Sequence, residues 1–426
     1  MVKNAILVYL WLFCSELIFA TAVLFGGGFM IPPQTARALS LGNAVTAGVN
    51  DPSAVYHNPA ALGEVEGNNI LISGTYIALL NNVENSGRSA VNKHDDNFLA
   101  SLFANYHIPD TDLTVGIGSY APFGLATTYE RDFTRFAAQR TELKTLYVTP
   151  TISWHPLRYL SVGGGVSFVH SSGLLSRSLC LNLAQQMCTQ AGTGEGRLRL
   201  TDTANAFAYN VGVLIEPVEN WKFGFHYRGR TDLRFDSADV KFGGVLAGTP
   251  KIKAQVRPLP LPAVINAGVH WKINDFWGAE FVYEHARWSA FKSLKATFLS
   301  GPLPGFNLPQ NWKNTTTLRL GSYYALNQNI ELRGGISVEE SPIPNRTLNP
   351  AIPDADKLTL NAGFGYKWER FSFDLGYQAV FFKTRRVSNN ELEGTPATAI
   401  PFNGAPGRDK YETFSNFVSL SLGYKF

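Results

Sequence analysis

The sequence predicts an all-β protein: one antiparallel transmembrane β-barrel of 14 strands with an N-terminal plug in its lumen. Three observations lead to this prediction. Apolar and polar side chains alternate with a two-residue period through most of the chain, and short connections alternate with long ones. Aromatic residues make up 13% of the 426 residues and charged residues only 16%, whereas soluble proteins average roughly 25% charged residues. The chain is therefore expected to expose apolar surface to lipid.

The bulk composition excludes other classes. A mean hydropathy of -0.05 is too low for a bundle of membrane helices, and beyond the N-terminus no uncharged apolar run reaches about 18 residues. The net charge of +4 is small and scattered, so nucleic acid is not an expected partner. No Ser/Gly/Pro linker or charge run divides the chain, which favours one large domain.

Residues 1–22, "MVKNAILVYLWLFCSELIFATA", have the layout of a signal peptide. A basic start at Lys3 is followed by an apolar core from Ala5 to Phe13, and the stretch ends in Ala-x-Ala. Signal peptidases require such small residues, so we expect cleavage after Ala22 and export of the chain. A membrane anchor is the alternative interpretation, but Glu16 interrupts the apolar run.

Residues 23–67 are predicted to form a plug, or hatch. They lack a regular period and are rich in Gly, Ala, Ser and Asn, which can turn tightly and bond to a polar wall. A 14-stranded cylinder is too wide for its own side chains to fill. Pro52 and Pro59 would keep the segment from joining the sheet as a strand. A disordered periplasmic tail is the alternative.

Residues 68–426 are predicted to form the barrel. In "FSFDLGYQAVF", Phe371 to Phe381, alternate positions are apolar, and "FSNFVSLSLGYKF" at the C-terminus repeats the pattern. Short turns on one side and long loops on the other are typical of outer-membrane barrels, and the even strand number puts both ends of the sheet in the periplasm. The short connections are "HIPDTD", "HPLRY", "EPVEN", "KIND", "LNQN" and "WER".

The surrounding lipid requires the barrel to close. Lipid offers no hydrogen-bond partner to a bare strand edge, so the first and last strands must pair. The terminal Phe426, with Tyr424 two places earlier, is typical of barrels presented to the outer-membrane assembly machinery, and a lipid-facing girdle residue fits equally well. We expect a monomer in contact with outer-membrane lipid.

Two cysteines remain after the expected cleavage, Cys180 and Cys188, both within one long loop. In an oxidising compartment they could close a disulfide. A metal site is the weaker interpretation because no His accompanies them. We expect no metal and no cofactor.

Several segments then resemble a known family. They are "ALSLGNAVTAGVNDPSAVYHNPAAL" in the plug, "RPLPLPAVINAGVHW", "WSAFKSLKATF", and "WKNTTTLRLGSYYALNQNIELRGGISVEESPIPNRTLNPAIPDADKLTLNAGFGY". Together they resemble the long-chain fatty acid transporter family of outer-membrane proteins, whose aromatic-hydrocarbon branch takes up toluene. The triplet Asn58-Pro59-Ala60 matches the signature of that family in the hatch.

The resemblance implies lateral release of cargo into the membrane through a gap at a kink in the third strand. That strand is expected at "LTVGIGSYAPFGL", Leu113 to Leu125. Gly116 and Gly118 would permit bending, and Pro122 removes a donor from the ladder. We expect the hatch triplet to meet this kink. The alternative is that these are ordinary glycines of a barrel strand.

The resemblance also implies an outer groove between long loops and an inner pocket. Exposed apolar side chains usually bind something, and candidates occur in two loops, although packing of one loop on itself is an equal alternative. Phe29 resembles the N-terminal aromatic residue that reaches the inner pocket in the family, but here several residues precede it. The loop candidates are Leu174, Leu175, Leu179, Leu183, Met187 and Phe242.

The function expected from the resemblance is passive uptake of hydrophobic compounds, long-chain fatty acids first and aromatic hydrocarbons as the alternative. A carboxylate would favour a cation beside an apolar pocket, and strand parity offers Arg319, Arg333 and Lys425. A passive porin for polar solutes and an enzyme built on a barrel are the alternatives from other classes. The residues show no nucleophile, base and orienter spacing that supports an enzyme.

Overall fold

A computed structural model describes residues 27–85, 87–93, 97–129, 133–180, 195–301, 305–388 and 409–426. The expected signal peptide, residues 1–22, lies outside these ranges. None of the helices in the described ranges is both long and apolar enough to pass through a bilayer.

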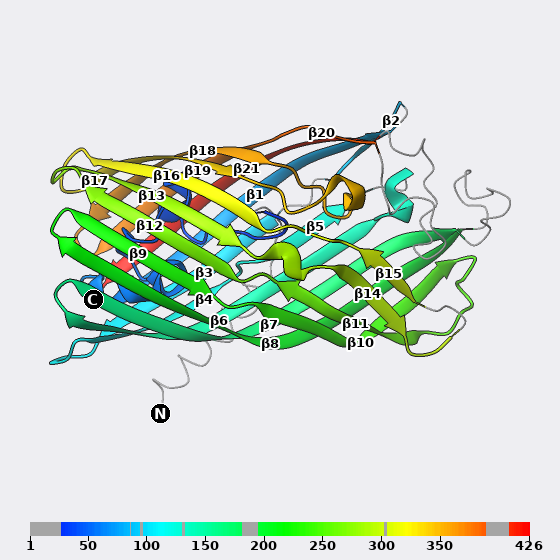
Figure 1. Cartoon of the computed structure of the whole chain (residues 1–426), viewed down its shortest axis with the longest axis horizontal. Helices are drawn as coiled ribbons and strands as arrows, with labels where there is room; N and C mark the ends of the chain where they lie inside the picture. The colour runs from blue at the N-terminus through cyan, green and yellow to red at the C-terminus, as the bar shows by residue number, and fades with distance from the viewer. Residues whose placement is uncertain are drawn as a thin grey trace.

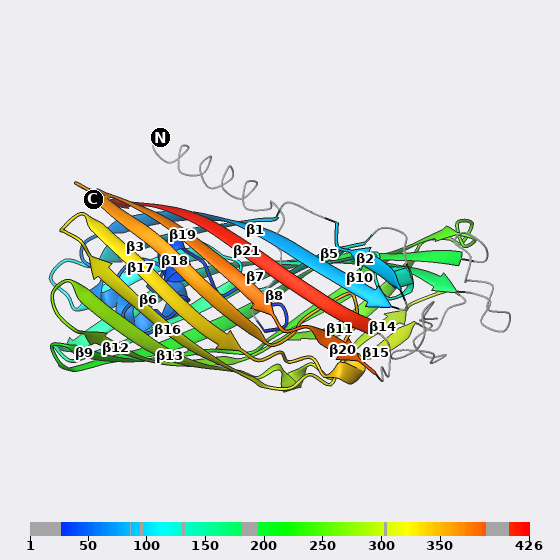
Figure 2. The same ribbon diagram turned by 90° about the horizontal axis from the view of Figure 1, so that it is seen from above.

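Fourteen antiparallel pairings form a closed ring, because the last strand pairs with the first from Asn69 opposite Lys425 to Asn85 opposite Asp409. The 14-stranded barrel predicted from the two-residue period is confirmed, and Figures 1 and 2 show its tilted strands. In order around the ring the strands are β1 (Asn69–Asn85), β3 (Asn97–His107), β4 (Leu113–Tyr120), β6 (Arg140–Leu157), β7 (Leu160–Cys180), β8 (Glu195–Val218), β9 (Trp221–Arg228), β12 (Val264–Lys272), β13 (Trp277–Ala286), β16 (Thr315–Ala325), β17 (Ile330–Glu339), β18 (Lys357–Trp368), β19 (Phe371–Phe382) and β21 (Asp409–Lys425).

Shorter elements extend the wall at one end, where the long connections lie (Figure 1). We call this the long-loop end and the opposite one the short-turn end; in outer-membrane barrels these face the outside and the periplasm. The added elements are β2 (Arg88–Val91), β5 (Gly124–Thr128), β10 (Thr231–Gly244), β11 (Ile252–Leu261), β14 (Ser293–Phe298), β15 (Phe306–Pro309), β20 (Arg385–Val387), η2 (Phe133–Phe136), η5 (Trp288–Ala290) and η6 (Asn345–Thr347).

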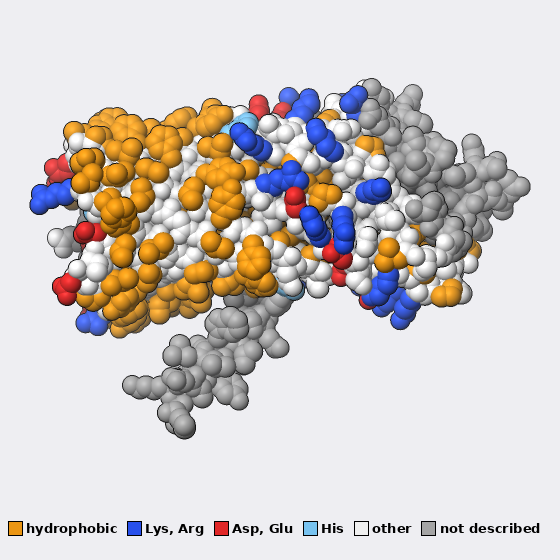
Figure 3. All heavy atoms as spheres, turned by 60° about the horizontal axis from the view of Figure 1, so that its bottom comes forward, with side chains coloured by type: hydrophobic (Ala, Val, Ile, Leu, Met, Phe, Trp, Pro, Cys, Tyr) orange, Lys and Arg blue, Asp and Glu red, His pale blue; other side chains and the backbone are white. Residues whose placement is uncertain are grey.

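The exterior carries a broad apolar belt over the short-turn half of the barrel, which Figure 3 shows in orange. Side chains of the belt are exposed, such as Phe207 (74%) and Leu420 (62%). The inward positions of the same strands are buried and largely small or polar, as with Ser415 and Ser419 on β21. This outside-apolar, inside-polar alternation suits a strand between lipid and a polar lumen.

Residues 27–67 precede β1 and lie inside the ring, where Figure 1 shows them in dark blue. They include α2 (Ala36–Ser40), α3 (Ala54–His57) and η1 (Pro59–Glu64). Helix α2 lies against β18 and β19, whereas η1 lies against β6, β7 and β8. Because these strands stand on different sides of the ring, the segment reaches across the lumen. We refer to residues 27–67 as the hatch.

Candidate hydrophobic ligand site

The triplet Asn58-Pro59-Ala60 fixes a turn of the hatch against the wall. Asn58 caps η1, since its Oδ1 accepts from the backbone N–H of Ala60 at 3.2 Å while its Nδ2 donates to the carbonyl of Thr46 at 2.8 Å. Pro59 occupies the first position of η1, where no N–H is needed.

The same triplet packs on the glycines Gly163 of β7 and Gly212 of β8, where a Cβ would collide with the backbone of Pro59 or the side chain of Asn58. Ser153 of β6 donates to the carbonyl of Ala60 at 2.9 Å. We expected the triplet at the kink of the third strand, but these contacts place it on β6, β7 and β8. Its capping and close packing explain the position.

A second anchor of the hatch was not expected from the sequence. Glu280 of β13 is buried and accepts hydrogen bonds from three successive backbone N–H groups, those of Thr46, Ala47 and Gly48, at 2.6, 2.7 and 2.7 Å. Three converging N–H groups form an anion-binding concavity. The carboxylate of the wall thus holds the backbone of the hatch, and no spacing in the sequence predicts this contact.

The wall is interrupted between β4 and β5. The ladder of β3 and β4 ends with Leu102 opposite Ser119, and β5 pairs with β6 alone. The part of β3 from Asn97 to Ser101 pairs with β1 on one side and has no ladder partner in β4 or β5 on the other. Pro122 lies in this interruption, which we call the break, residues 121–123.

Gly116 and Gly118 do not make the break. Both pair regularly with β3 and with β6, so our expectation that they bend the strand is corrected. A Cβ at either position would lie within 3.0 Å of a methyl of Val55. The two glycines therefore let the hatch approach the wall closely, while the interruption comes three residues later.

The first hatch residues occupy the break. The N–H of Ile31 donates to the carbonyl of Pro122 at 2.8 Å, and the N–H of Gly124 donates to the carbonyl of Phe29 at 3.0 Å. Gln34 accepts from the N–H of Ala121 at 3.2 Å. These contacts satisfy backbone groups that the lost ladder leaves without partners, and the side chain of Gln34 gave no signal in the sequence.

Gln34 also reaches the other side of the break. Its backbone carbonyl oxygen accepts from the hydroxyl of Ser101 on β3 at 2.5 Å. The chain of contacts from β3 through Gln34 to Ala121 replaces the missing strand pairing. Displacing this part of the hatch would leave a strand edge facing the bilayer or the cargo.

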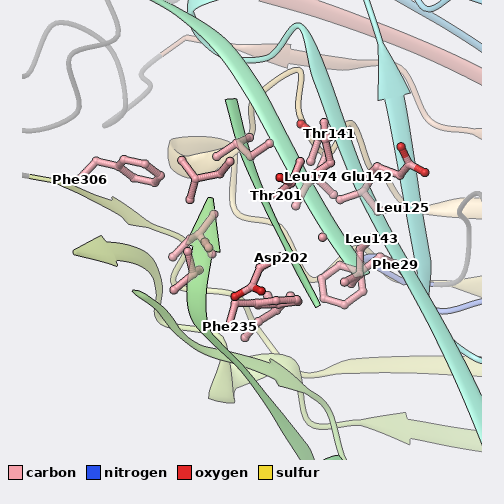
Figure 4. A pocket seen from close by; sticks show the side chains of 18 of the residues that line it. Phe29, Leu125, Thr141, Glu142, Leu143, Leu174, Thr201, Asp202, Phe235 and Phe306 are labelled. Atoms are coloured by element: carbon pink, nitrogen blue, oxygen red, sulfur yellow. The ribbon is translucent and has the colours of Figure 1, made fainter. Parts of the chain in front are cut away.

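An apolar pocket of about 110 Å³ lies in the long-loop half of the barrel, between β5 to β8 on one side and β10, β11, β14 and β15 on the other (Figure 4). Its volume is of the order of a cavity known to hold benzene, roughly 150 Å³. The apolar lining residues are Phe29, Leu125, Leu143, Leu174, Leu175, Leu200, Phe235, Ala238, Val256, Leu259, Phe291, Leu294, Phe306 and Ile352.

Phe29 forms one wall of the pocket. Its ring is 1% exposed and packs 4.7 Å from the ring of Trp288 and 5.6 Å from that of Trp312, centroid to centroid. Gly28, with a φ of +73°, lies so close to both tryptophans that a Cβ would overlap the ring of Trp312. The two tryptophans were missed as site residues, although both open segments that carried the family resemblance.

The leucine candidates separate into three groups. Leu174 and Leu175 of β7 line the pocket. Leu179 is buried in a second apolar cluster, which shares Leu200, Ala238 and Phe306 with the pocket and against which Phe242 packs, so these two support the loop structure around the pocket. Leu183, Met187 and Cys188 fall outside the described residues, as does the side chain of Cys180, and the expected disulfide stays a prediction.

The three cations proposed as carboxylate partners are already paired. Arg319 bonds to Glu284 at 2.8 Å, Arg333 to Asp374 at 2.6 Å, and Lys425 lies 3.4 Å from Glu66. None of the three lines the pocket, so their expected role is corrected. Strand parity placed Arg319 and Arg333 on the inner face but could not show their acidic neighbours.

The charged groups of the pocket are acidic. Its described lining includes Glu142 and Asp202 and no Lys, Arg or His. Glu142 is paired with Arg140 and Lys144. Asp202 points toward Phe235 in Figure 4 and accepts from the backbone N–H of Ser237 at 3.1 Å. The pocket therefore provides apolar contact without a cation for an anionic ligand.

Two polar cavities border the hatch at the short-turn end. Their volumes are about 650 and 320 Å³. Both are bordered by Arg37 and Glu64 of the hatch, and the first also by Glu331 and Asp374 of the wall. Below the hatch the lumen is therefore lined by charges of both signs. Within the described ranges no three His, Cys, Asp or Glu side chains gather as a metal site.

Known proteins share this architecture. The solved structure of a Pseudomonas aeruginosa FadL homologue superposes with a TM-score of 0.80 at 20% identity, covering 94% of this chain and all of that one. The toluene transporter TodX of Pseudomonas putida superposes with a TM-score of 0.72 at 16% identity, covering 92% of this chain and 98% of that one. At these identities the likeness establishes the fold.

Sequence comparison gives the family. The long-chain fatty acid transport protein of Escherichia coli K12 is 24% identical over 380 residues, 81% of this chain and 85% of that protein. Outer membrane protein P1 of Haemophilus influenzae is 23% identical over 374 residues, 81% of this chain and 78% of that protein. The family model described as "Outer membrane protein transport protein (OMPP1/FadL/TodX)" matches residues 17–426. The chain therefore belongs to the OMPP1/FadL/TodX family of outer membrane transport proteins, which carry hydrophobic substrates.

Proposed function

We propose that this protein is a passive channel that takes up hydrophobic compounds at the long-loop end and releases them sideways into the membrane at the break. The observation that carries the proposal is the position of Phe29. Its ring lines the pocket, and its carbonyl oxygen is bonded to Gly124 beside the break. Movement of this one segment by cargo would thus act on the wall opening. No reaction is required.

The free-energy cost of exposing an alkyl chain to water favours release through the wall. An alkyl chain that left through the short-turn end would pass the polar cavities around Arg37 and enter water. Exposure to water costs roughly 0.8 kcal/mol per CH₂ group. Release through the wall keeps the chain in apolar surroundings, because outward side chains beside the break, such as Phe98 of β3 and Ile117 of β4, are exposed and apolar.

Two cargo classes fit the proposal. A long-chain fatty acid is the first, supported by relatives that bear this name. An uncharged hydrocarbon is the second, favoured by the pocket, whose described lining holds Glu142 and Asp202 and no cation. A fatty acid anion would have to keep its carboxylate outside this pocket, since burial of an unpaired charge is costly.

Uptake in cells tests both points. A strain that lacks the gene receives the wild-type gene or the variants Pro122→Val and Pro150→Val, and uptake of radiolabelled oleate and toluene is measured. Pro122→Val restores a backbone donor at the break and is expected to lower uptake several-fold. Pro150→Val is the matched control, because Pro150 lies in the continuous ladder of β4 and β6.

The outcomes separate the alternatives. Recovery of oleate uptake alone identifies the fatty acid channel, and recovery of toluene uptake alone identifies the hydrocarbon channel. Equal uptake by the Pro122→Val variant and the wild type would remove the break from the route. If neither compound depends on the gene, the proposed function is wrong.

A further inference from the structure

A cluster of cations lies on the outside of the wall, beyond the apolar belt toward the long-loop end. Figure 3 shows the Lys and Arg side chains gathered there. Between β9 and β10 the outward face changes from Phe225 of β9, 50% exposed, to exposed Arg230, which lies just before β10. We define the cationic rim as Arg199 of β8, Arg234 and Lys241 of β10, Lys253 and Arg257 of β11, and Lys295 of β14, all exposed.

The rim is continuous across four neighbouring strands. Lys241 stands directly opposite Arg199 in the ladder of β8 and β10. The ladder of β11 and β14 ends with Val256 opposite Ala296, so Arg257 and Lys295 are the next residues of the two strands. Cations that are distant in sequence are thereby brought onto one outer surface.

Most of the rim lacks acidic partners on the protein. Lys253 pairs with Asp239, and Arg257 pairs with Asp236. Arg199, Arg234, Lys241 and Lys295 form no ion pair within 4 Å among the described residues. Like charges directly opposite each other destabilise a strand pair, as between Lys241 and Arg199, so the arrangement calls for an external anion.

We propose that the cationic rim binds the phosphorylated head group of an outer-leaflet lipid whose acyl chains lie on the adjoining apolar belt. A soluble anion could use only the cations, whereas a phosphorylated lipid uses both surfaces at once. Clusters of Lys and Arg beside membrane-exposed apolar surface attract anionic head groups at roughly 1 kcal/mol per cation. Lipid A, with its sugar phosphates and acyl chains, has this chemistry.

The bound lipid would brace the pocket from outside. The strands that carry the rim also supply inner-face residues to the pocket, including Leu200 of β8, Ala238 of β10, Val256 of β11 and Leu294 of β14. A head group that bridges these strands holds their spacing without contacting the cargo. The inference rests on the outer face alone and holds for either cargo class.

The test is a titration of the purified full-length protein, in non-ionic detergent, with fluorescent bis-phosphorylated lipid A. The rim variant combines Arg199→Gln, Arg234→Gln, Lys241→Gln and Lys295→Gln. It is expected to bind lipid A about tenfold more weakly or worse. Wild-type protein is expected to show the same loss with lipid A from which both phosphates have been removed.

A matched control keeps the result specific. Lys93→Gln, Lys313→Gln, Lys383→Gln and Arg386→Gln remove the same charge from exposed positions on other parts of the chain. Equal weakening in this control, or unchanged binding by the rim variant, would overturn the proposal. Competition by inorganic phosphate alone at millimolar concentration would assign the rim to soluble anions instead. A wild-type β-sheet circular dichroism spectrum of the rim variant shows that it is folded.

Discussion

Phe29 contacts the pocket with its side chain and the break with its backbone carbonyl group. Its side chain packs among Trp288, Trp312 and Phe291 and lines the pocket. Its carbonyl oxygen accepts from Gly124 at the break. A ligand that displaces the ring must rotate or shift Phe29. The backbone of the same residue makes the hydrogen bond at the break. Under the proposed function, this residue would couple occupancy of the pocket to the wall.

We predict that Phe29→Ala weakens cargo binding by about tenfold, since loss of a fully buried phenyl ring costs roughly 3 to 5 kcal/mol and part of that contact is made to the ligand. Fluorescent fatty acid and hydrocarbon analogues titrated into the purified protein give the dissociation constant. Phe103→Ala is the matched control, because Phe103 is equally buried on β3 and does not line the pocket. Equal effects of the two substitutions would contradict the role of Phe29.

The strands were predictable from the sequence and the break was predictable only in part. A two-residue period with one lipid-facing side depends only on residues close in sequence, so strands such as Phe371–Phe382 can be predicted from the sequence alone. Pro122 lies in the interruption, but Gly116 and Gly118 serve close packing with Val55. A sequence does not distinguish a glycine that bends a strand from one that admits a neighbour.

The hatch anchors were less accessible to sequence analysis. Glu280 bonds to backbone N–H groups of residues more than 200 positions away, and such contacts use no side chain of the hatch. The cations Arg319 and Arg333 were placed on the inner face by parity, but their pairing with Glu284 and Asp374 depends on which strands are neighbours. Arg319 and Glu284 lie on the paired strands β16 and β13, and Arg333 and Asp374 lie on β17 and β19, which flank β18.

At the scale of the hatch we predict that Glu280→Gln makes the barrel leaky to small polar solutes. The amide offers one acceptor where the carboxylate offers two, and its NH₂ group would face N–H donors of residues 46–48. Each hydrogen bond to a charged group contributes about 1.5 to 3 kcal/mol. Proteoliposome swelling with a small sugar measures the leak.

Glu219→Gln is the control for this prediction, because Glu219 is exposed in the turn between β8 and β9. We expect wild-type permeability from it. A Glu280→Gln protein as tight as this control would show that the remaining contacts of the hatch, such as those of Asn58 and Ser153, hold it unaided.

The barrel is apolar outside and contains buried ionisable groups in its lumen. The free energy of unfolding should therefore depend on pH. His57 of the hatch shows how. Burial, together with the positive charges of Arg228 and Arg319, lowers the pKa of His57 from 6.5 to about 3. The folded protein therefore holds this imidazole neutral at pH 7, and protonation of the unfolded chain begins well before that of the folded one as the pH falls.

The sign of the pH dependence follows from this order. The contribution of neutral His57 to the free energy of unfolding is complete above about pH 6.5 and declines as the pH falls toward 3, by up to about 1.4 kcal/mol per pH unit. We predict that His57→Gln, which cannot be protonated, flattens the dependence between pH 6.5 and 4. Guanidinium unfolding of both proteins in lipid vesicles at three pH values gives the slopes. The substitution itself lowers stability at pH 7, so the comparison rests on the slope: identical slopes for the two proteins would mean that His57 gains a proton in the folded state as readily as in the unfolded one.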